Sequence, residues 1–142
     1  MQSDFSPNYS IEYSNPLRTQ STHLKSGDQI ITDAPTDNHG KGEAFSPTDL
    51  LSSSLISCAM TIMGIAAGRD GIEIISMNAD VAKEMASNPR RVAKVSANIK
   101  VVLKGASEED AERLRRVGLA CPVAHSLSSE LIQDININFQ LN

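Results

Sequence analysis

Residues 46–68 read SPTDLLSSSLISCAMTIMGIAAG, and they carry the strongest structural signal in the chain. Ser46 can accept hydrogen bonds from the first free backbone N–H groups of a helix, and Asp49, three positions later, completes a capping box. Pro47 suits the first helical turn because it has no N–H group to leave unpaired. We therefore expect a helix from Pro47 to about Gly68, a left-handed C-cap candidate, with a length of about 30 Å.

The expected helix carries no charged residue from Leu50 to Gly68, a run of 19 residues. That length could span a bilayer. However, serine, threonine and glycine residues dilute the run, and no other stretch of the chain is as long and apolar. A helix that is apolar on nearly all sides is equally typical of a helix enclosed by protein. We expect a core helix with Cys58 in its middle, and no membrane association.

Short strands joined by turns are predicted for the first third of the chain. Apolar and polar residues alternate over residues 9–13, and further runs cover residues 17–25 and 29–32. Between the last two runs, Gly27 can take the positive φ of a tight hairpin. Residues 33–42 are dense in turn formers and have no periodicity, which predicts a loop.

Beyond Gly71 the pattern changes to period two, which predicts half-buried strands. One strand is expected to share these residues on one face: Ile75, Met77, Ala79 and Val81. After a break at Asn88-Pro89, a second has a longer apolar face: Val95, Ala97, Ile99, Val101 and Leu103. The last strand runs to the C-terminus with a third such set: Ile135, Ile137, Phe139 and Leu141.

Helices separate the last two of these strands. Ser107 with Asp110 repeats the capping-box pattern and predicts an amphipathic helix that ends at Leu119. Its expected inner residues are Ala111, Leu114 and Val117. The Cys121-Pro122 pair then interrupts the helical pattern, and a short helix is expected from Pro122 to about Leu131. Because strands and helices come in separate blocks, the predicted fold class is α+β.

The length and the net charge of the chain limit the classes of function that it can have. The 142 residues fit a single domain, residues 1–142. The net charge is -4, with 13 Lys and Arg against 17 Asp and Glu, which argues against a nucleic-acid partner. The start of the chain has no basic segment followed by an apolar run, so we expect no signal peptide and a cytoplasmic location.

Two cysteines, Cys58 and Cys121, stand 63 positions apart. They are too few for a disulfide-stapled scaffold and wrongly spaced for a zinc knuckle. Cys121 precedes Pro122, so as the N-cap of a helix its thiolate would be favoured. Cys58 has no charged neighbour in sequence and would need a cation from elsewhere in the fold. Either both cysteines are small buried hydrophobes, or they form a redox pair across the fold.

Charged and titratable residues leave further alternatives open. Arg18 is either a surface charge or the cation that a buried thiolate needs. No spacing such as CxxC or HExxH supports a metal site or a hydrolase triad drawn from the remaining candidates: His23, His39, His125, Asp33 and Asp37. We expect neither a metal nor a cofactor.

Three short motifs in the chain resemble those of one known family. They are SPTDLL at residues 46–51, CAM at 58–60 on the same helix, and CPV at 121–123. Together they resemble the OsmC/Ohr family, of osmotically inducible protein C and organic hydroperoxide resistance protein, in an OsmC-like branch. The match covers essentially the whole chain, and the order of the expected elements agrees with it.

The resemblance implies a thiol peroxidase, active in oxidative-stress defence. In the family the helix cysteine is peroxidatic and the Cys-Pro cysteine resolves it, so Cys58 would attack the peroxide and Cys121 would then form a disulfide with it. Arg18 matches the position of the family's arginine, which would hold Cys58 as the thiolate and polarise the peroxide. A hydroperoxide substrate and a thiol or dithiol reductant are the implied partners.

One position departs from the family pattern. The family usually carries a glutamate directly after the proline of the helix-start motif, where it orients the arginine. Thr48 stands there in this chain, and Asp49 and Glu43 are the two carboxylates expected to replace it. The roles of His23 and His125 stay open.

The resemblance also implies antiparallel sheets wrapped around the long central helix in an intertwined homodimer, with each site built from both chains. The alternative function is a non-catalytic OsmC-like protein that binds a small hydrophobic ligand, or a redox sensor.

Overall fold

The computed structural model describes residues 4–142, and its contacts divide the chain into two compact units, residues 1–50 and 51–142. The absence of a signal peptide was inferred partly from residues 1–3, which lie outside the described residues. Each unit is built around its own three-stranded sheet.

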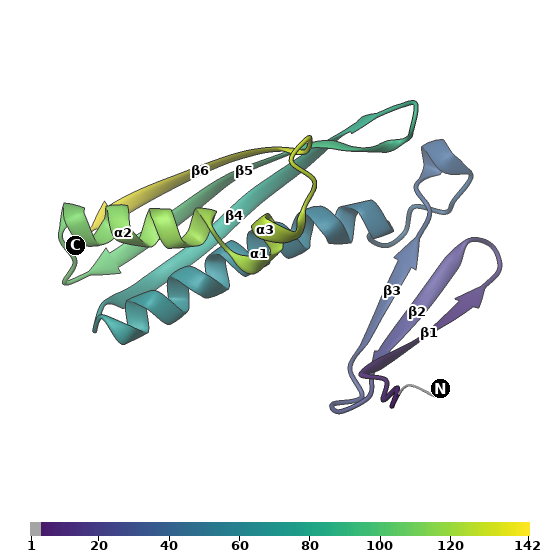
Figure 1. Ribbon diagram of the computed structural model, residues 1–142, viewed down its shortest axis with the longest axis horizontal. Helices are drawn as coiled ribbons and strands as arrows, with labels where there is room; N and C mark the ends of the chain where they lie inside the picture. Colours follow the sequence, from purple (N-terminus) through teal and green to yellow (C-terminus); the bar gives the residue numbers. More distant parts are fainter. Residues whose placement is uncertain (1–3) are drawn as a thin grey trace. The chain divides into compact units, whose positions relative to one another are not determined.

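The smaller unit contains an antiparallel sheet in the order β1-β2-β3 (Figure 1). Its strands are β1 (Tyr9–Ser14), β2 (Arg18–His23) and β3 (Gln29–Asp33). Gly27 has φ +80° in the turn between β2 and β3, which confirms the predicted hairpin. The predicted loop follows β3 and contains one turn of 3-10 helix, η1 (Thr36–Asn38).

Helix α1 (Pro47–Arg69) begins as predicted. The Ser46 N–H donates to Asp49 Oδ2 at 2.9 Å and the Asp49 N–H donates to Ser46 Oγ at 3.0 Å, which completes the capping box. The prediction of Gly68 as the C-cap was wrong, because Gly71 takes the left-handed conformation with φ +71°. There the Ile72 N–H donates to the Ala67 carbonyl, a hydrogen bond that closes a helix end around such a glycine.

The larger unit contains a sheet in the order β4-β5-β6. These strands are β4 (Glu73–Ala86), β5 (Arg91–Lys104) and β6 (Ile132–Leu141). β5 pairs antiparallel with β4 and parallel with β6. This sheet is therefore mixed rather than antiparallel, because the connection from β5 to β6 crosses back along the sheet before β6 begins.

A β-bulge alters the predicted face of β4. Ile74 pairs with Leu103 and Ser76 pairs with Val102, which leaves Ile75 as the extra residue. Ile74, Met77 and Ala79 pack against the core, whereas Ile75 is 49% exposed. The strict alternation was wrong at Ile75 because a bulge shifts which side chains face inward. Val81 is also exposed.

The inner face of β5 agrees with the prediction, since its five apolar residues are all buried with helix residues such as Leu55 and Leu114 in one core. Because these residues share one face of the sheet, α1 and α2 (Glu108–Leu119) must cover that face, as Figure 1 shows. A capping box between Ser107 and Asp110 starts α2.

Two details of the connecting helices differ from the predictions. The third buried residue of α2 is Gly118 rather than Val117, and a Cβ at Gly118 would lie 2.9 Å from Met63 Cγ, so α2 approaches α1 closely there. Helix α3 (Pro122–Ser126) is shorter than expected. The Ser126 hydroxyl donates to the Pro122 carbonyl, and a turn at residues 128–131 follows, so serine side chains favour ending the helix.

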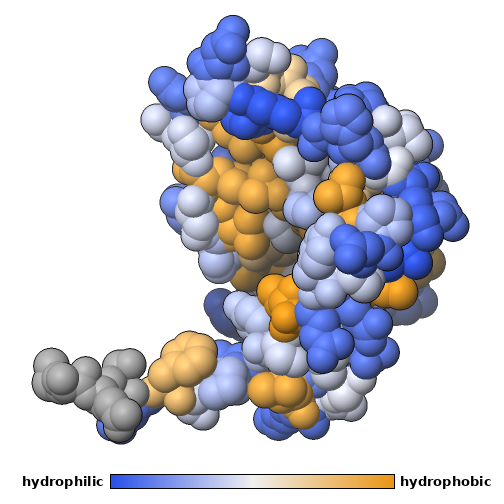
Figure 2. All heavy atoms as spheres, turned by 90° about the vertical axis from the view of Figure 1, so that its right-hand side faces the viewer, coloured by the Kyte–Doolittle hydropathy of each residue, from blue (hydrophilic) through white to orange (hydrophobic). Residues whose placement is uncertain are grey.

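Helix α1 is long and apolar enough to cross a membrane by length and composition, and it is the one such helix among residues 4–142. Leu55, Ala59 and Met63 on this helix have no exposed surface, as expected for a core helix. Other apolar residues of α1, including Leu51 and Ile65, are exposed. Figure 2 shows hydrophobic side chains gathered on the protein surface beside hydrophilic ones.

Candidate active site

Cys58 lies at the middle of α1, where the buried core and the surface of the helix meet. Its side chain is half-buried and packs against the core cluster. The capping box at Ser46 sets where α1 begins, and the buried side chains of Leu55 and Met63 hold this part of the helix in the core, which determines the position of Cys58.

Cys121 is the N-cap residue of α3 and has no exposed surface. Its thiol donates to the carbonyl oxygen of Leu55, with Sγ and O 3.8 Å apart. Leu55 precedes Cys58 by less than one helical turn, so this contact places Cys121 against the part of α1 that carries the other cysteine.

The pKa of the Cys121 thiol is raised, chiefly because burial disfavours the thiolate. The backbone N–H groups of Ala124 and Val123 act in the opposite direction, while the neighbouring Cys58 thiol raises the pKa further by hydrogen bonding and by charge repulsion. The N–H groups at the helix start favour the Cys121 thiolate, as expected, but the loss of solvent outweighs them and the pKa is raised overall.

The structure thus brings together two thiols that lie 63 positions apart in sequence. A half-buried thiol beside a buried protonated one is an arrangement that can undergo two-electron oxidation, in which the first sulfur is oxidised and the second condenses with it.

Arg18 belongs to the smaller unit and lies at the start of β2, directly opposite Asp33 at the end of β3. Its guanidinium forms a two-bond ion pair with that carboxylate, from Nε to Oδ1 at 2.7 Å and from Nη2 to Oδ2 at 2.8 Å. The hydrogen bonds to Arg18 lower the pKa of Asp33, and the same bonds raise the pKa of Arg18. Both groups are therefore charged at neutral pH.

Asp33 was not among the carboxylates expected to orient Arg18. Asp49 accepts the Ser46 N–H in the capping box, and Glu43 acts on Arg18 through its charge. The hairpin register could have identified Asp33, because a turn centred on Gly27 brings Arg18 and Asp33 to opposing positions.

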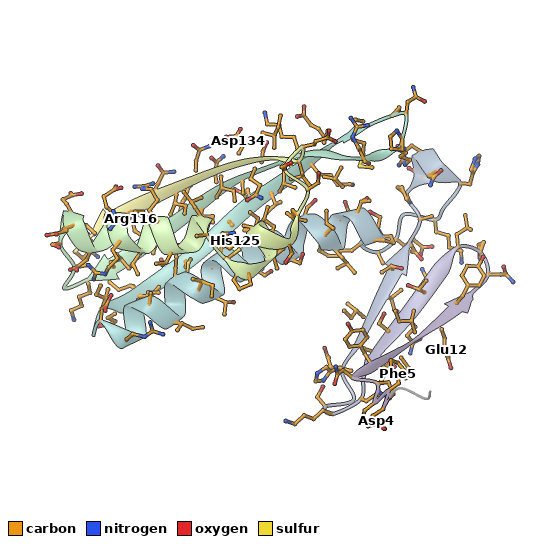
Figure 3. All side chains as sticks on the ribbon, viewed as in Figure 1. Asp4, Phe5, Glu12, Arg116, His125 and Asp134 are labelled. Atoms are coloured by element: carbon orange, nitrogen blue, oxygen red, sulfur yellow. The ribbon has the colours of Figure 1, made fainter. Side chains whose placement is uncertain are left out.

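The histidines have no catalytic arrangement with the cysteines in the described contacts. Nδ1 of His23 lies 2.7 Å from the Ser26 hydroxyl in the β2–β3 turn. His125 lies on α3 with an exposed side chain, and its backbone N–H donates to the Cys121 carbonyl (Figure 3). Over residues 4–142, no group of three or more His, Cys, Asp or Glu side chains could hold a metal ion.

These features define an α+β protein with a cysteine-bearing core helix and a second cysteine at the start of a short helix. The comparisons with known proteins identify that class. The family model of OsmC-like protein matches residues 40–136, and the chain belongs to this family. No curated protein sequence matches the chain significantly.

Solved structures agree with the family assignment. A Psychrobacter arcticus 273-4 protein, named for osmotic stress and detoxification response, is 41% identical with a TM-score of 0.87, over 97% of this chain and 100% of that one. An OsmC-like protein from Mycoplasma pneumoniae is 18% identical with a TM-score of 0.73, over 98% and 99% of the two chains. The organic hydroperoxide resistance protein OhrB of Bacillus subtilis is 14% identical with a TM-score of 0.61, over 96% and 98%. The last two show the shared fold.

Proposed function

We propose that this protein is a cysteine-based peroxidase that reduces organic hydroperoxides through Cys58 and Cys121. The observation that carries the proposal is the contact between the two thiols, one half-buried on α1 and one buried at the start of α3. The family supports it, since its members of known structure include proteins named for organic hydroperoxide resistance. Two cysteines in contact supply the electrons for one peroxide without a metal or a cofactor.

In the proposed reaction, the Cys58 thiolate attacks the terminal oxygen of the hydroperoxide. The O–O bond breaks, an alcohol leaves after taking up a proton, and Cys58 becomes a sulfenic acid. The Cys121 sulfur then attacks the Cys58 sulfur, the S–O bond breaks, and water leaves as the disulfide forms. An external thiol or dithiol supplies two electrons and two protons to restore both thiols.

The raised pKa of Cys121 fits the resolving role. A protonated Cys121 does not compete for peroxide, because the thiolate is the nucleophile. Its proton becomes available when the sulfenic acid forms and hydroxide must leave as water. The two cysteines therefore have separate roles that follow from their different burial.

Arg18 is proposed to hold Cys58 as the thiolate and to polarise the bound peroxide, the role that the family resemblance assigns to it. Two of the five guanidinium N–H donors are used by Asp33. The remaining donors have the charge and geometry that a thiolate and a peroxide oxygen would require.

We further propose an intertwined homodimer in the cytoplasm, with each site built from both chains and residues 1–142 acting as a single domain. The exposed apolar residues of α1, such as Leu51 and Ile65, support a partner chain. A stable, fully folded monomer at micromolar concentration, measured by sedimentation, would contradict this assembly.

The test treats the fully reduced protein with one equivalent of cumene hydroperoxide and follows intact mass and free thiols. The wild type should lose both thiols and gain a Cys58–Cys121 disulfide. Cys121→Ser should stop at a sulfenic acid that dimedone traps on Cys58, whereas Cys58→Ser should not react at the same rate. If the wild type retains both thiols, the enzymatic proposal fails.

The alternative function, binding of a small hydrophobic ligand, has one observation in its favour. The smaller unit has a hollow of about 510 Å³ on its sheet, whose lining includes Tyr9, Ile11 and Ile30. Retention of both thiols together with saturable binding of an apolar fluorophore, weakened by Ile11→Ser, would favour this function over the peroxidase.

A further inference from the structure

Asp33 is a buried carboxylate at the end of β3, with only 1% of its surface exposed. A buried charge of this kind is costly unless hydrogen bonds compensate it. Both of its oxygens bond to Arg18, and Oδ2 also accepts the backbone N–H of Glu43 at 3.1 Å. The carboxylate is therefore held from two sides.

These bonds connect three segments of the smaller unit. Arg18 comes from β2, Asp33 ends β3, and Glu43 lies in the segment that leads to α1. The Asp33 N–H also donates to the Phe45 carbonyl at 3.1 Å, one residue before the Ser46 cap. Asp33 thus fixes the guanidinium of Arg18 relative to the chain that enters α1.

The loop between Asp33 and Glu43 is closely packed on this junction. A Cβ at Gly40 would lie 1.7 Å from the Ala34 carbonyl oxygen, so only glycine fits there without a backbone shift. The Gly42 N–H donates to the same carbonyl at 3.2 Å. Such packing limits the freedom of Asp33 and makes it a rigid support for Arg18.

We propose that Asp33 is the positioning residue for Arg18, and that in this chain it performs the orienting task for which a glutamate would be expected at Thr48. The inference rests on the proposed function of Arg18 at Cys58. A two-bond pair between a carboxylate and a guanidinium fixes both the distance and the plane of the cation. The side-chain charges of Lys41 and Glu43 act on this pair through space, in addition to the hydrogen bond from the Glu43 backbone.

The test uses the full chain with Cys121→Ser, so that Cys58 is the one remaining thiol. Two quantities are measured: the rate constant for oxidation of Cys58 by cumene hydroperoxide, and the pH profile of its alkylation by iodoacetamide. We expect Asp33→Asn to slow oxidation about tenfold and to move the alkylation profile to higher pH, because a misplaced cation stabilises the thiolate less. Asp33→Glu should recover part of the loss.

A double-mutant cycle separates positioning from a general structural role. In an Arg18→Ala background, Asp33→Asn should change both quantities by less than about twofold, because its effect passes through the guanidinium. The matched control is Asp70→Asn, which removes the carboxylate from another arginine pair, with Arg113, and should leave both quantities unchanged.

Two outcomes would overturn the inference. In the first, Arg18→Ala slows the oxidation of Cys58 but Asp33→Asn has no effect. In the second, Asp33→Asn has an equal effect with and without Arg18. Failure of the proposed function gives a different result. In that case the wild type keeps both thiols in the presence of peroxide, while the pH profile of alkylation still reports whether Asp33 acts on Cys58 through Arg18.

Discussion

Replacing Gly118 with alanine should destabilise the larger unit, although alanine is the better helix former. In a helix interior the change from glycine gains about 1 kcal/mol from backbone entropy alone. Here the added Cβ would lie 2.9 Å from Met63 Cγ and 3.1 Å from its Sδ. Met63 has no exposed surface, so it cannot swing into solvent to make room. Overpacking of a closed core costs about 1–3 kcal/mol, so a net loss of about 1 kcal/mol is expected.

The assay is urea unfolding of the reduced protein followed by circular dichroism. Gly68→Ala is the matched control, since among residues 4–142 a Cβ at that helical position has no atom within 4 Å apart from its chain neighbours and the adjacent helix backbone, and it should gain about 1 kcal/mol. In a Met63→Ala background the clash disappears, and Gly118→Ala should then stabilise the protein. If Gly118→Ala raises the free energy of unfolding of the wild type, the close approach of α1 and α2 is refuted.

The same substitution bears on the chemistry, because Gly118 lies three residues before Cys121 and Met63 lies five residues after Cys58. A shift at this crossing changes the separation of the two sulfurs. We therefore expect Gly118→Ala to slow formation of the disulfide by stoichiometric peroxide, with the oxidation of Cys58 itself less affected. Equal slowing of both steps would argue against this explanation.

Three further predictions concern charge and packing. Burial raises the pKa of the Cys121 thiol in the folded state. The contribution of the protonated thiol to stability is full below its unfolded pKa of about 8.5 and is lost as the pH rises through the folded value. The free energy of unfolding should therefore fall more from about pH 8 to pH 10 in the wild type than in Cys121→Ala. Hydrogen bonds from Arg18 lower the pKa of Asp33, so the contribution of the Asp33 carboxylate to stability is present above about pH 4 and is lost in acid. The free energy of unfolding should therefore fall less steeply with decreasing pH in Asp33→Asn than in the wild type. Ile99→Ala should cost about 2–5 kcal/mol and Ile75→Ala no more than about 0.5 kcal/mol, because one side chain is fully buried and the other lies on a bulge; equal losses in urea unfolding would contradict the assigned faces.

Local patterns were sufficient to predict most of the elements. The two capping boxes mark helix starts because they depend only on residues three apart, Ser46 with Asp49 and Ser107 with Asp110. The alternation in β5 predicts its buried face because that face packs evenly along the strand. Such signals need no knowledge of distant parts of the chain.

Other features depend on contacts between distant segments, and the sequence does not show them. The bulge at Ile75 arises from pairing with β5, and the parallel direction of β6 depends on how α2 and α3 lead the chain back. Gly118 is buried because Met63, 55 positions earlier, packs against it.

Some features of the candidate site could likewise be predicted from local sequence, and others depend on distant contacts. The Cys-Pro motif placed Cys121 correctly at a helix start, but its protonation depends on burial by the core, which local sequence does not reveal. Family resemblance, rather than spacing, paired Cys121 with Cys58. The pairing of Arg18 with Asp33 follows from the register of the β2–β3 hairpin, which the residues near the helix start at Asp49 do not indicate.

The parallel pairing of β5 with β6 has a consequence for synthesis of the protein on the ribosome. β5 is the middle strand of its sheet, yet one of its edges stays open until residues 132–141 emerge, nearly 30 residues after β5 itself is made. During that interval a strongly apolar strand exposes unpaired backbone groups to other nascent chains. Nascent chains that stall before residue 132 should therefore depend more on chaperones than the finished protein does.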